Sequence, residues 1–265
     1  PALPAAYADW PALSPAITSD AAIEAQVAAI LAGMTLEQKV GQMVQGEIAS
    51  TTPADVATYS LGSMLNGGGS WPGGNRHAAA ADWLALADRF WASSPTIAGT
   101  MIPVIWGIDA VHGNNNVYGA TVFPHNIGLG AAHDGCLVKE IGAATAQQVR
   151  GTGQDWAFGP TLAVVRDDRW GRTYEGFSED PAIVRWYGEK AFLGFGDLDP
   201  DGKRLHGVLA TAKHYIGDGG TTGGKDQGDN QYPESDLINI FGQGYYGALG
   251  PGGGQTVMIS FNSWD

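Results

Sequence analysis

The sequence predicts an α/β protein built as a (β/α)8 barrel of the TIM type, from three features of its pattern. Short apolar runs of strand length alternate with amphipathic helical segments, which indicates a parallel sheet with right-handed crossovers. The runs are apolar almost throughout, as strands covered on both faces should be. A polar cluster follows most of them. Polar groups after several strands favour a barrel over a doubly wound sheet, where ligand-binding residues gather at one switch point.

The elements are expected in a regular order along the chain. Residues 1–34 form an extended, proline-rich arm and a helix, and residues 35–265 form the barrel domain. Thr35 opens the first helix of that domain with a capping box, Asn75 is expected to cap a later helix, and Pro233 to open the last one. The strands are expected at 61–65, 103–108, 156–165, 208–212 and 256–261.

About five or six strands can be predicted, whereas a barrel needs eight. The chain stops at Asp265, directly after a predicted strand. We therefore expect a barrel truncated after these strands, as part of a longer protein.

The composition limits the classes of partner. The chain has 265 residues, of which 44% are hydrophobic and 15% charged, a globular composition with no apolar run long enough to span a membrane. Its net charge of −13 disfavours nucleic acid and anionic lipid surfaces as partners, whereas a neutral sugar is not repelled. The single cysteine, Cys136, excludes an internal disulfide, and we expect it to be buried and inert.

The densest polar cluster, residues 166–181, follows the third predicted strand and holds three arginines and five acidic residues. A solvated loop of ion pairs is the simpler interpretation. Against it, Trp170, Tyr174 and Phe177 are unusual in such a loop. Arginines held rigid by carboxylates and aromatic rings can present a planar fork of donors to ligand hydroxyls.

Two further clusters follow strands. Lys213 and His214 come after the fourth, where adjacent side chains reach one ligand only if the strand ends or twists. The simpler interpretation of these two residues is a core histidine beside a lysine at the rim of the sheet. Asp109 ends the second strand, where a lone carboxylate needs a partner or a ligand, and it can accept hydrogen bonds from two vicinal hydroxyls. The simpler interpretation is that Asp109 caps the following turn.

Metal and nucleotide sites find little support in the sequence. There is no His-Glu-x-x-His, no phosphate-binding loop and no Gly-x-Ser-x-Gly elbow. Asp197, Asp199 and Asp201 match the first half of a calcium loop, but Val208 stands where the bidentate Glu belongs. A polar surface turn is the simpler interpretation, so no cofactor is expected, with calcium as the alternative.

Five blocks of sequence together resemble glycoside hydrolase family 3, from about Thr35 to the end of the chain. They are Gly-Ile-Asp-Ala-Val-His-Gly at 107–113, Thr-Val-Phe-Pro-His-Asn-Ile-Gly at 121–128, 168–172 continuing to Glu-Asp-Pro at 179–181, Ala-Lys-His-Tyr at 212–215 and Met-Ile-Ser-Phe-Asn-Ser-Trp at 258–264. The similarity is greatest to its exo-acting β-1,3/1,4-glucan glucohydrolases and β-glucosidases. The Gly-Asp-Gly-Gly run after Lys-His is part of it.

The resemblance implies a barrel domain whose Asp109, Arg172, Lys213 and His214 hold the glucosyl unit of a β-glucan or β-glucoside. Asn66 is a further candidate for substrate binding, and Trp264, or Trp71 in the glycine-rich loop, could stack on a sugar face. It also implies a secreted or periplasmic enzyme that releases glucose with retained configuration.

The family's two catalytic carboxylates have no counterpart in this chain. The nucleophile lies in a Ser-Asp-Trp motif that is absent here, Asp265 stands too early to replace it, and the general acid belongs to a second α/β-sandwich domain, also absent. We therefore assign no catalytic residue, expect both carboxylates beyond Asp265, and predict that this chain alone is inactive.

Several alternatives remain open. Within the family these are β-xylosidase and β-N-acetylglucosaminidase activity, although the latter enzymes carry a Pro-Gly-His-Gly run where this chain has Tyr215 to Gly220. Outside it they are a non-catalytic carbohydrate-binding barrel and a metalloenzyme that uses His112 and His214.

Overall fold

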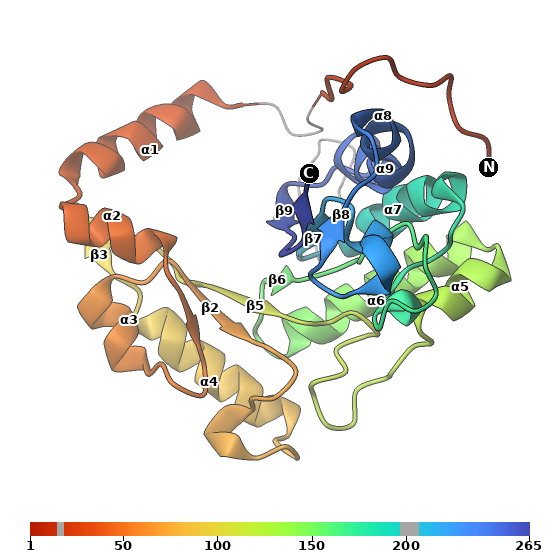
Figure 1. The fold of residues 1–265 in the computed structure, drawn as a ribbon. Coiled ribbons are helices and arrows are strands. Elements are labelled where there is room, and N and C mark those ends of the chain that lie inside the picture. The colour runs from red at the N-terminus through yellow and green to blue at the C-terminus, as the bar shows by residue number, and fades with distance from the viewer. Residues whose placement is uncertain (15–18, 197–206) are drawn as a thin grey trace.

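The centre of the protein is a six-stranded parallel sheet (Figure 1). The structure is a computed structural model that describes residues 1–14, 19–196 and 207–265. The strand order is β1-β2-β5-β6-β7-β9, which is also the chain order. The strands are β1 (Gln45–Glu47), β2 (Ser63–Asn66), β5 (Ile105–Ile108), β6 (Trp156–Ala157), β7 (Leu209–Tyr215) and β9 (Thr256–Ile259). Because this order never reverses, the sheet has no switch point and winds in one direction, as in a barrel. The predicted fold class is confirmed.

Helices connect consecutive strands of the sheet, which is the predicted alternation. The large aromatic side chains of the core, Trp83, Phe90, Tyr187, Phe241 and Tyr245, are almost fully buried. The connecting helices are α3 (Pro53–Tyr59), α4 (Ala80–Ala92), α5 (Asn126–Ala132), α6 (Gly135–Gly151), α7 (Pro181–Gly196) and α9 (Gln243–Leu249). Helices α6 and α7 approach so closely that a Cβ on Gly194 would lie 2.2 Å from the carbonyl oxygen of Lys139.

Short elements complete the described chain. These are η1 (Pro72–Gly74), β3 (Thr96–Ile97), β4 (Thr100–Met101), η2 (Thr173–Glu175), η3 (Asp218–Gly220), η4 (Thr222–Gly224), β8 (Asp229–Asn230), α8 (Glu234–Asp236), the π-helix η5 (Leu237–Phe241) and β10 (Ser263–Trp264). Strands β8 and β10 pair with each other outside the main sheet.

The short strands β3, β4, β8 and β10 were not predicted, and two strands of the main sheet also differ from the prediction. Strand β1 was not predicted, because its three residues, Gln45 to Glu47, contain no apolar run. Strand β6 ends at Ala157 instead of continuing to residue 165. Pro160 has no N–H to donate to a neighbouring strand, and beyond it only isolated bridges at Thr161 and Val164 remain.

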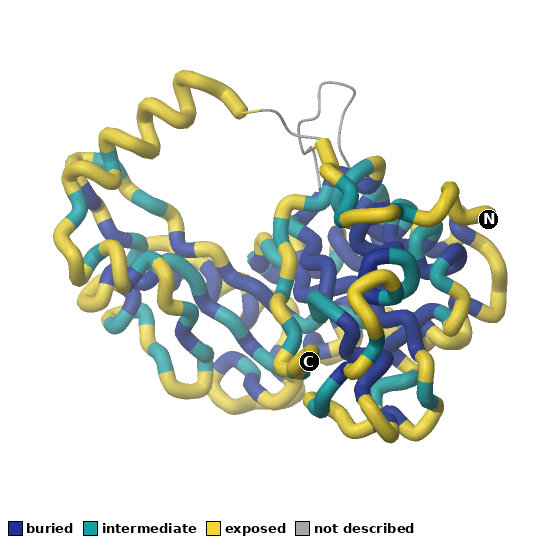
Figure 2. Tube along the Cα trace, turned by 45° about the horizontal axis from the view of Figure 1, so that its top comes forward, coloured by how far each residue is buried: buried dark blue, intermediate teal, exposed yellow. Residues whose placement is uncertain are grey.

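The N-terminal segment holds an arm and two helices, α1 (Ala21–Gly33) and α2 (Leu36–Met43). Helix α1 buries none of its residues and stands away from the sheet (Figures 1 and 2). The predicted capping box of α2 is present, with hydrogen bonds in both directions between Thr35 and Gln38. In the arm, Tyr7 exchanges backbone hydrogen bonds of 2.8 and 3.0 Å with the side chain of Asn239.

Three local predictions need correction. The N-cap of α4 is Ala79, and Asn75 instead accepts a hydrogen bond from the backbone of His77, because the chain makes a turn before the helix starts. Pro233 is the N-cap of α8 and not a residue of its first turn. Cys136 is exposed, because the packed face of α6 is formed by other residues: Gly135, Val138, Gly142, Thr145, Ala146 and Val149. Of the helices described, none combines the length and apolar character needed to cross a membrane.

Candidate functional site

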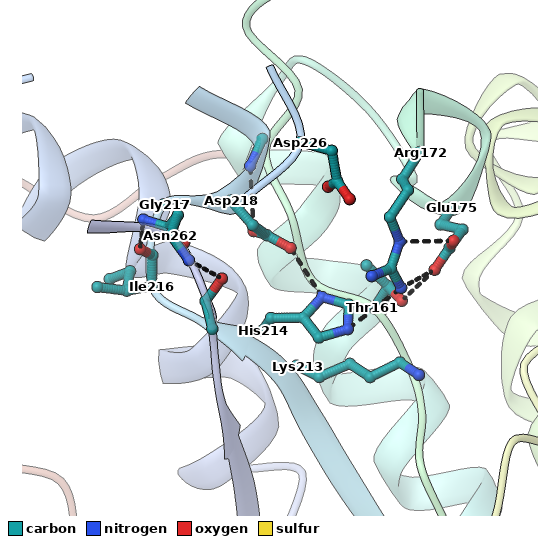
Figure 3. A network of polar contacts seen from close by, with 12 residues as sticks. Thr161, Arg172, Glu175, Lys213, His214, Ile216, Gly217, Asp218, Asp226 and Asn262 are labelled. Carbon is teal, nitrogen blue, oxygen red and sulfur yellow. Dashed lines mark hydrogen bonds and ion pairs between the residues drawn. The ribbon is translucent and has the colours of Figure 1, made fainter. Parts of the chain in front are cut away.

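The structure brings four of the predicted site residues together at the carboxyl edge of the sheet (Figure 3 shows three of them). Asp109 follows β5, Arg172 lies in the loop after β6, and Lys213 and His214 belong to the end of β7. In a parallel sheet the carboxyl ends of neighbouring strands meet at one edge, so residues far apart in sequence converge there.

Lys213 is paired with Asp109. Its Nζ donates to Asp109 Oδ1 over 3.1 Å. The lysine side chain is only 5% exposed, whereas the aspartate side chain is 37% exposed. A buried ammonium group requires a partner, and Asp109 supplies it while keeping part of its carboxylate open to solvent.

Arg172 is held by Glu175 and faces His214. Its Nε and Nη2 donate to the two oxygens of Glu175 over 2.8 and 2.7 Å, a bidentate pair. Nη2 also lies 3.2 Å from Nε2 of His214. No hydrogen bond from Nη1 is found within residues 1–14, 19–196 and 207–265. The guanidinium is therefore fixed on one side and has donors left for a ligand.

An irregularity in β7 explains how Lys213 and His214 reach the same site. Lys213 lies opposite Met258 and Tyr215 opposite Ile259, so His214 is an extra residue in the ladder. Such a bulge changes the direction of a side chain in an otherwise alternating strand. The peptide bond between Lys213 and His214 is cis.

The loop after β7 supports His214 through Asp218. Oδ2 of Asp218 lies 2.8 Å from His214 Nδ1, and Oδ1 accepts a hydrogen bond from the N–H of Gly219. Gly219 of this loop lies against protein backbone: a Cβ on it would lie 2.6 Å from the carbonyl oxygen of Val164, and its own carbonyl accepts from the N–H of Arg166 over 2.8 Å.

The charges of this network determine the ionisation of Glu175. Burial pulls the pKa of its carboxyl upward, but the hydrogen bonds and charge of Arg172, with the charge of Lys213, outweigh burial and hold the pKa below its ordinary value of 4.5. The hydrogen bonds to Glu175 raise the pKa of Arg172 in turn. The pair is therefore ionised at neutral pH.

The arginine-rich loop divides into two parts. In its outer part, Asp167 and Arg169 form a solvated ion pair over 2.6 Å, as the simpler interpretation of this loop predicted, and the arginine side chain is 75% exposed. The hydrogen bonds from Arg169 lower the pKa of Asp167 to about 2. Its inner part is anchored by buried Trp170, whose Nε1 donates to Asp226 over 2.9 Å. Of the three arginines in this loop, only Arg172, beyond this anchor, joins the site, together with Glu175.

His112 pairs with another histidine. Its Nε2 lies 2.8 Å from Nδ1 of His125, and the ring of Tyr174 packs against both imidazoles. Burial, and secondarily the neighbouring His125, lower the pKa of His112. Together with the engagement of His214 by Arg172 and Asp218, this arrangement gives no support to a metal site shared by His112 and His214.

Two other predicted residues lie apart from the network. Asn66 is buried, and its Oδ1 accepts from Trp106 Nε1 over 3.2 Å. Trp264 is 44% exposed and donates from its Nε1 to the carbonyl of Tyr232. Within the described residues, no hydrogen bond or ion pair joins either side chain to the network. Their roles in sugar binding stay predictions.

The sequence reasoning did not single out Glu175 and Asp218 as site residues. Spacing was the available signal. Glu175 stands three residues after Arg172, and Asp218 four residues after His214, distances at which oppositely charged side chains often meet.

The described residues contain no group of three or more His, Cys, Asp or Glu side chains able to hold a metal ion. The candidate calcium ligands Asp197, Asp199 and Asp201 lie outside the described residues, so calcium binding there stays a prediction.

The chain is similar in structure to the exo-1,3/1,4-β-glucanase of a Pseudoalteromonas species. The TM-score is 0.91 and the sequences are 49% identical, over 97% of this chain and 32% of that one. In sequence it is 32% identical to the lysosomal β-glucosidase of Dictyostelium discoideum, over 87% of this chain and 30% of the relative. It is 27% identical to the periplasmic β-glucosidase of Salmonella typhimurium, over 91% of this chain and 29% of the relative. The chain thus spans about a third of the length of these proteins.

The sequence profile of the glycosyl hydrolase family 3 N-terminal domain matches residues 35–265. This match covers most of the chain and confirms the resemblance predicted from the five sequence blocks. The chain belongs to glycosyl hydrolase family 3, of which it carries the N-terminal domain.

Proposed function

We propose that this chain belongs to a retaining exo-acting β-glucosidase or β-glucan glucohydrolase, and that Asp109, Arg172, Lys213 and His214 hold the glucosyl unit of its substrate. The observation that carries the proposal is the convergence of these four side chains at one edge of the sheet. The 49% identity to an exo-1,3/1,4-β-glucanase supports the choice of a β-glucan substrate.

The free hydrogen-bonding capacity of the network suits a sugar. Asp109 keeps part of its carboxylate exposed and can accept from two vicinal hydroxyls, while Lys213 uses only one of its three donors on Asp109. Nη1 of Arg172 adds two donors. These groups are held by ion pairs before a ligand arrives, so binding does not require them to be ordered first.

Retaining hydrolysis requires two carboxyl groups about 5–5.5 Å apart, one as nucleophile and one as acid and base. We place both outside residues 1–265. The role of the present network is to bind the sugar while its ring flattens toward an oxocarbenium-like state. Hydrogen bonds that tighten as the ring flattens lower the barrier, because they bind the transition state more strongly than the substrate.

The test is hydrolysis by the full-length protein of the nitrophenyl β-glucoside, β-xyloside and β-N-acetylglucosaminide. We expect preference for the glucoside, with β-glucose as the first anomer seen by NMR. The 265-residue chain alone should release nothing measurable. Preference for another glycoside would assign a sister activity, and α-glucose as first product would exclude retention.

A non-catalytic carbohydrate-binding barrel is the competing outcome. It would follow if the full-length protein hydrolysed none of the three glycosides but released heat on calorimetric titration with glucose or laminaribiose. Absence of both hydrolysis and binding would reject the sugar site itself.

We further propose a secreted or periplasmic location, which the similarity to a periplasmic β-glucosidase supports. The substrate is the only partner proposed. The strong negative charge of the chain argues against nucleic acid and against anionic membrane surfaces.

A further inference from the structure

We propose that Asp218 is a positioning residue that fixes the tautomer of His214 and, through it, the orientation of the Arg172 guanidinium. The kinetic consequence rests on the proposed function, but the tautomer itself does not. The proposal starts from a chain of contacts that runs from Asp218 through His214 and Arg172 to Glu175 (Figure 3).

The neighbours of His214 specify where its proton lies. A carboxylate oxygen accepts hydrogen bonds, so Asp218 Oδ2, at 2.8 Å, requires a hydrogen on Nδ1. A guanidinium only donates, so Arg172 Nη2, at 3.2 Å, requires a lone pair on Nε2. The two requirements come from opposite sides of the ring and agree on one form, the neutral imidazole protonated at Nδ1.

The other forms of the ring conflict with Arg172. A proton on Nε2 would face the donating Nη2 across the same 3.2 Å, with two donors and no acceptor between them. A doubly protonated ring would add the repulsion of two positive charges. The charged groups around the ring are Asp218 in its own loop, Lys213 beside it, and Arg172, Glu175 and Asp226 from the loops after β6 and β7.

Asp218 is itself held in place. Its side chain is 9% exposed, and Gly219 N–H donates to the oxygen that His214 does not use. The carboxylate therefore cannot easily rotate away, which is what a group that fixes a tautomer requires.

The consequence for a ligand concerns Arg172. Nε and Nη2 contact Glu175 and His214, and the two N–H groups on Nη1 remain for a ligand. The direction of these two N–H groups is set by the contacts that hold Nε and Nη2. If His214 carried its proton on Nε2, Nη2 would have to move away, and Nη1 would move with it because the guanidinium is planar. Asp218 thus sets the position of donors that it does not touch.

The test compares Asp218→Asn with Asp218→Glu in the full-length protein. The Asn amide can donate to Nδ1 and reverse the tautomer, whereas Glu keeps the carboxylate. We expect Asp218→Asn to lower kcat/KM for the nitrophenyl glucoside by about 10- to 100-fold, and Asp218→Glu to recover part of that loss. Asp134→Asn is the matched control. Asp134 is the N-cap of α6 and no member of the network, and because Asn caps a helix equally well, activity should not change.

The tautomer is measured directly by NMR of the protein labelled with ¹⁵N-histidine. The His214 signals are identified by their loss in His214→Gln. We expect a protonated Nδ1 and a bare Nε2 in the unmodified protein, and the reverse in Asp218→Asn. A bare Nδ1 in the unmodified protein, or activity of Asp218→Asn within twofold of it, would overturn the proposal.

The two measurements separate this proposal from the proposed function. If the protein hydrolysed no glycoside, the function would fail while the NMR signals still decided the tautomer. If Asp218→Asn did not fold, the spectrum of the unmodified protein would still decide the tautomer, and the activity and spectrum of Asp218→Glu would test the role of the carboxylate.

Discussion

Replacing Glu175 by Gln should destabilise the protein through Arg172. The change preserves the size of the side chain but removes its charge and turns one acceptor into a donor. One of the two charge-assisted bonds, at 2.7 and 2.8 Å, is then lost, and the new amide group faces an N–H of Arg172.

The magnitude follows from the burial of the pair. Breaking a fully buried ion pair by removing one partner costs about 3–5 kcal/mol. Here the glutamate side chain is 11% exposed and that of Arg172 is 32% exposed, so water can compensate part of the loss. We therefore expect the free energy of unfolding at neutral pH to fall by about 1–3 kcal/mol.

The effect should depend on pH in a defined direction. The pKa of Glu175 in the folded protein lies below 4.5, its ordinary value and the one expected in the unfolded chain. Its contribution to stability is therefore complete above pH 4.5 and is lost as the pH falls through the folded pKa. The difference between Glu175→Gln and the unmodified protein should shrink on acidification below about pH 4.5.

Urea denaturation followed by tryptophan fluorescence, at neutral pH and at several acidic pH values, measures both quantities. Glu189→Gln is the matched control, because Glu189 forms a single hydrogen-bonded ion pair with its neighbour Lys190, in which both side chains are more exposed than that of Glu175, and it should contribute less than about 1 kcal/mol. A cost of Glu175→Gln no greater than that of the control at neutral pH, or one that does not change with acidification, would contradict a stabilising role for the pair.

Three other outcomes are expected. Lys213→Met should lower kcat/KM of the full-length protein about 30- to 1000-fold, as loss of a buried charged contact to the transition state; a change under threefold would remove the lysine from the site. Gly107→Ala should lower the free energy of unfolding measured by urea denaturation by about 1–3 kcal/mol, because the new Cβ would lie 2.2 Å from the ring of Phe158. Gly67→Ala is the control and should leave this free energy unchanged, because a Cβ there would meet open space. Cys136 is exposed, so the folded protein should react rapidly with one equivalent of a thiol reagent such as DTNB; reaction only after unfolding would contradict its position.

The alternation of elements was predictable because it depends on local patterns. Apolar runs of strand length located β2, β5, β7 and β9 to within a few residues. The expectation that such strands are covered on both faces is wrong for β9, where Val257 and Ile259 are exposed. The capping box at Thr35 was predictable for the same reason: both of its partners lie within four residues of each other. Strand β1 was missed because Gln45-Gly46-Glu47 has no apolar pattern, and it is a strand only because β2 pairs with it.

Short patterns and recurrent motifs were enough to predict the alternation of strands and helices, the family, and the residue types at the carboxyl edge. Which charges meet there depends on the folded arrangement. The bulge in β7 turns Lys213 and His214 into one site, the fold brings Asp109 to a lysine more than a hundred residues away in the chain, and Glu175 and Asp218 fix the orientation of their neighbours. The pairing of Asp109 with Lys213 depends on β5 and β7 ending at the same edge of the sheet, which spacing along the chain does not specify.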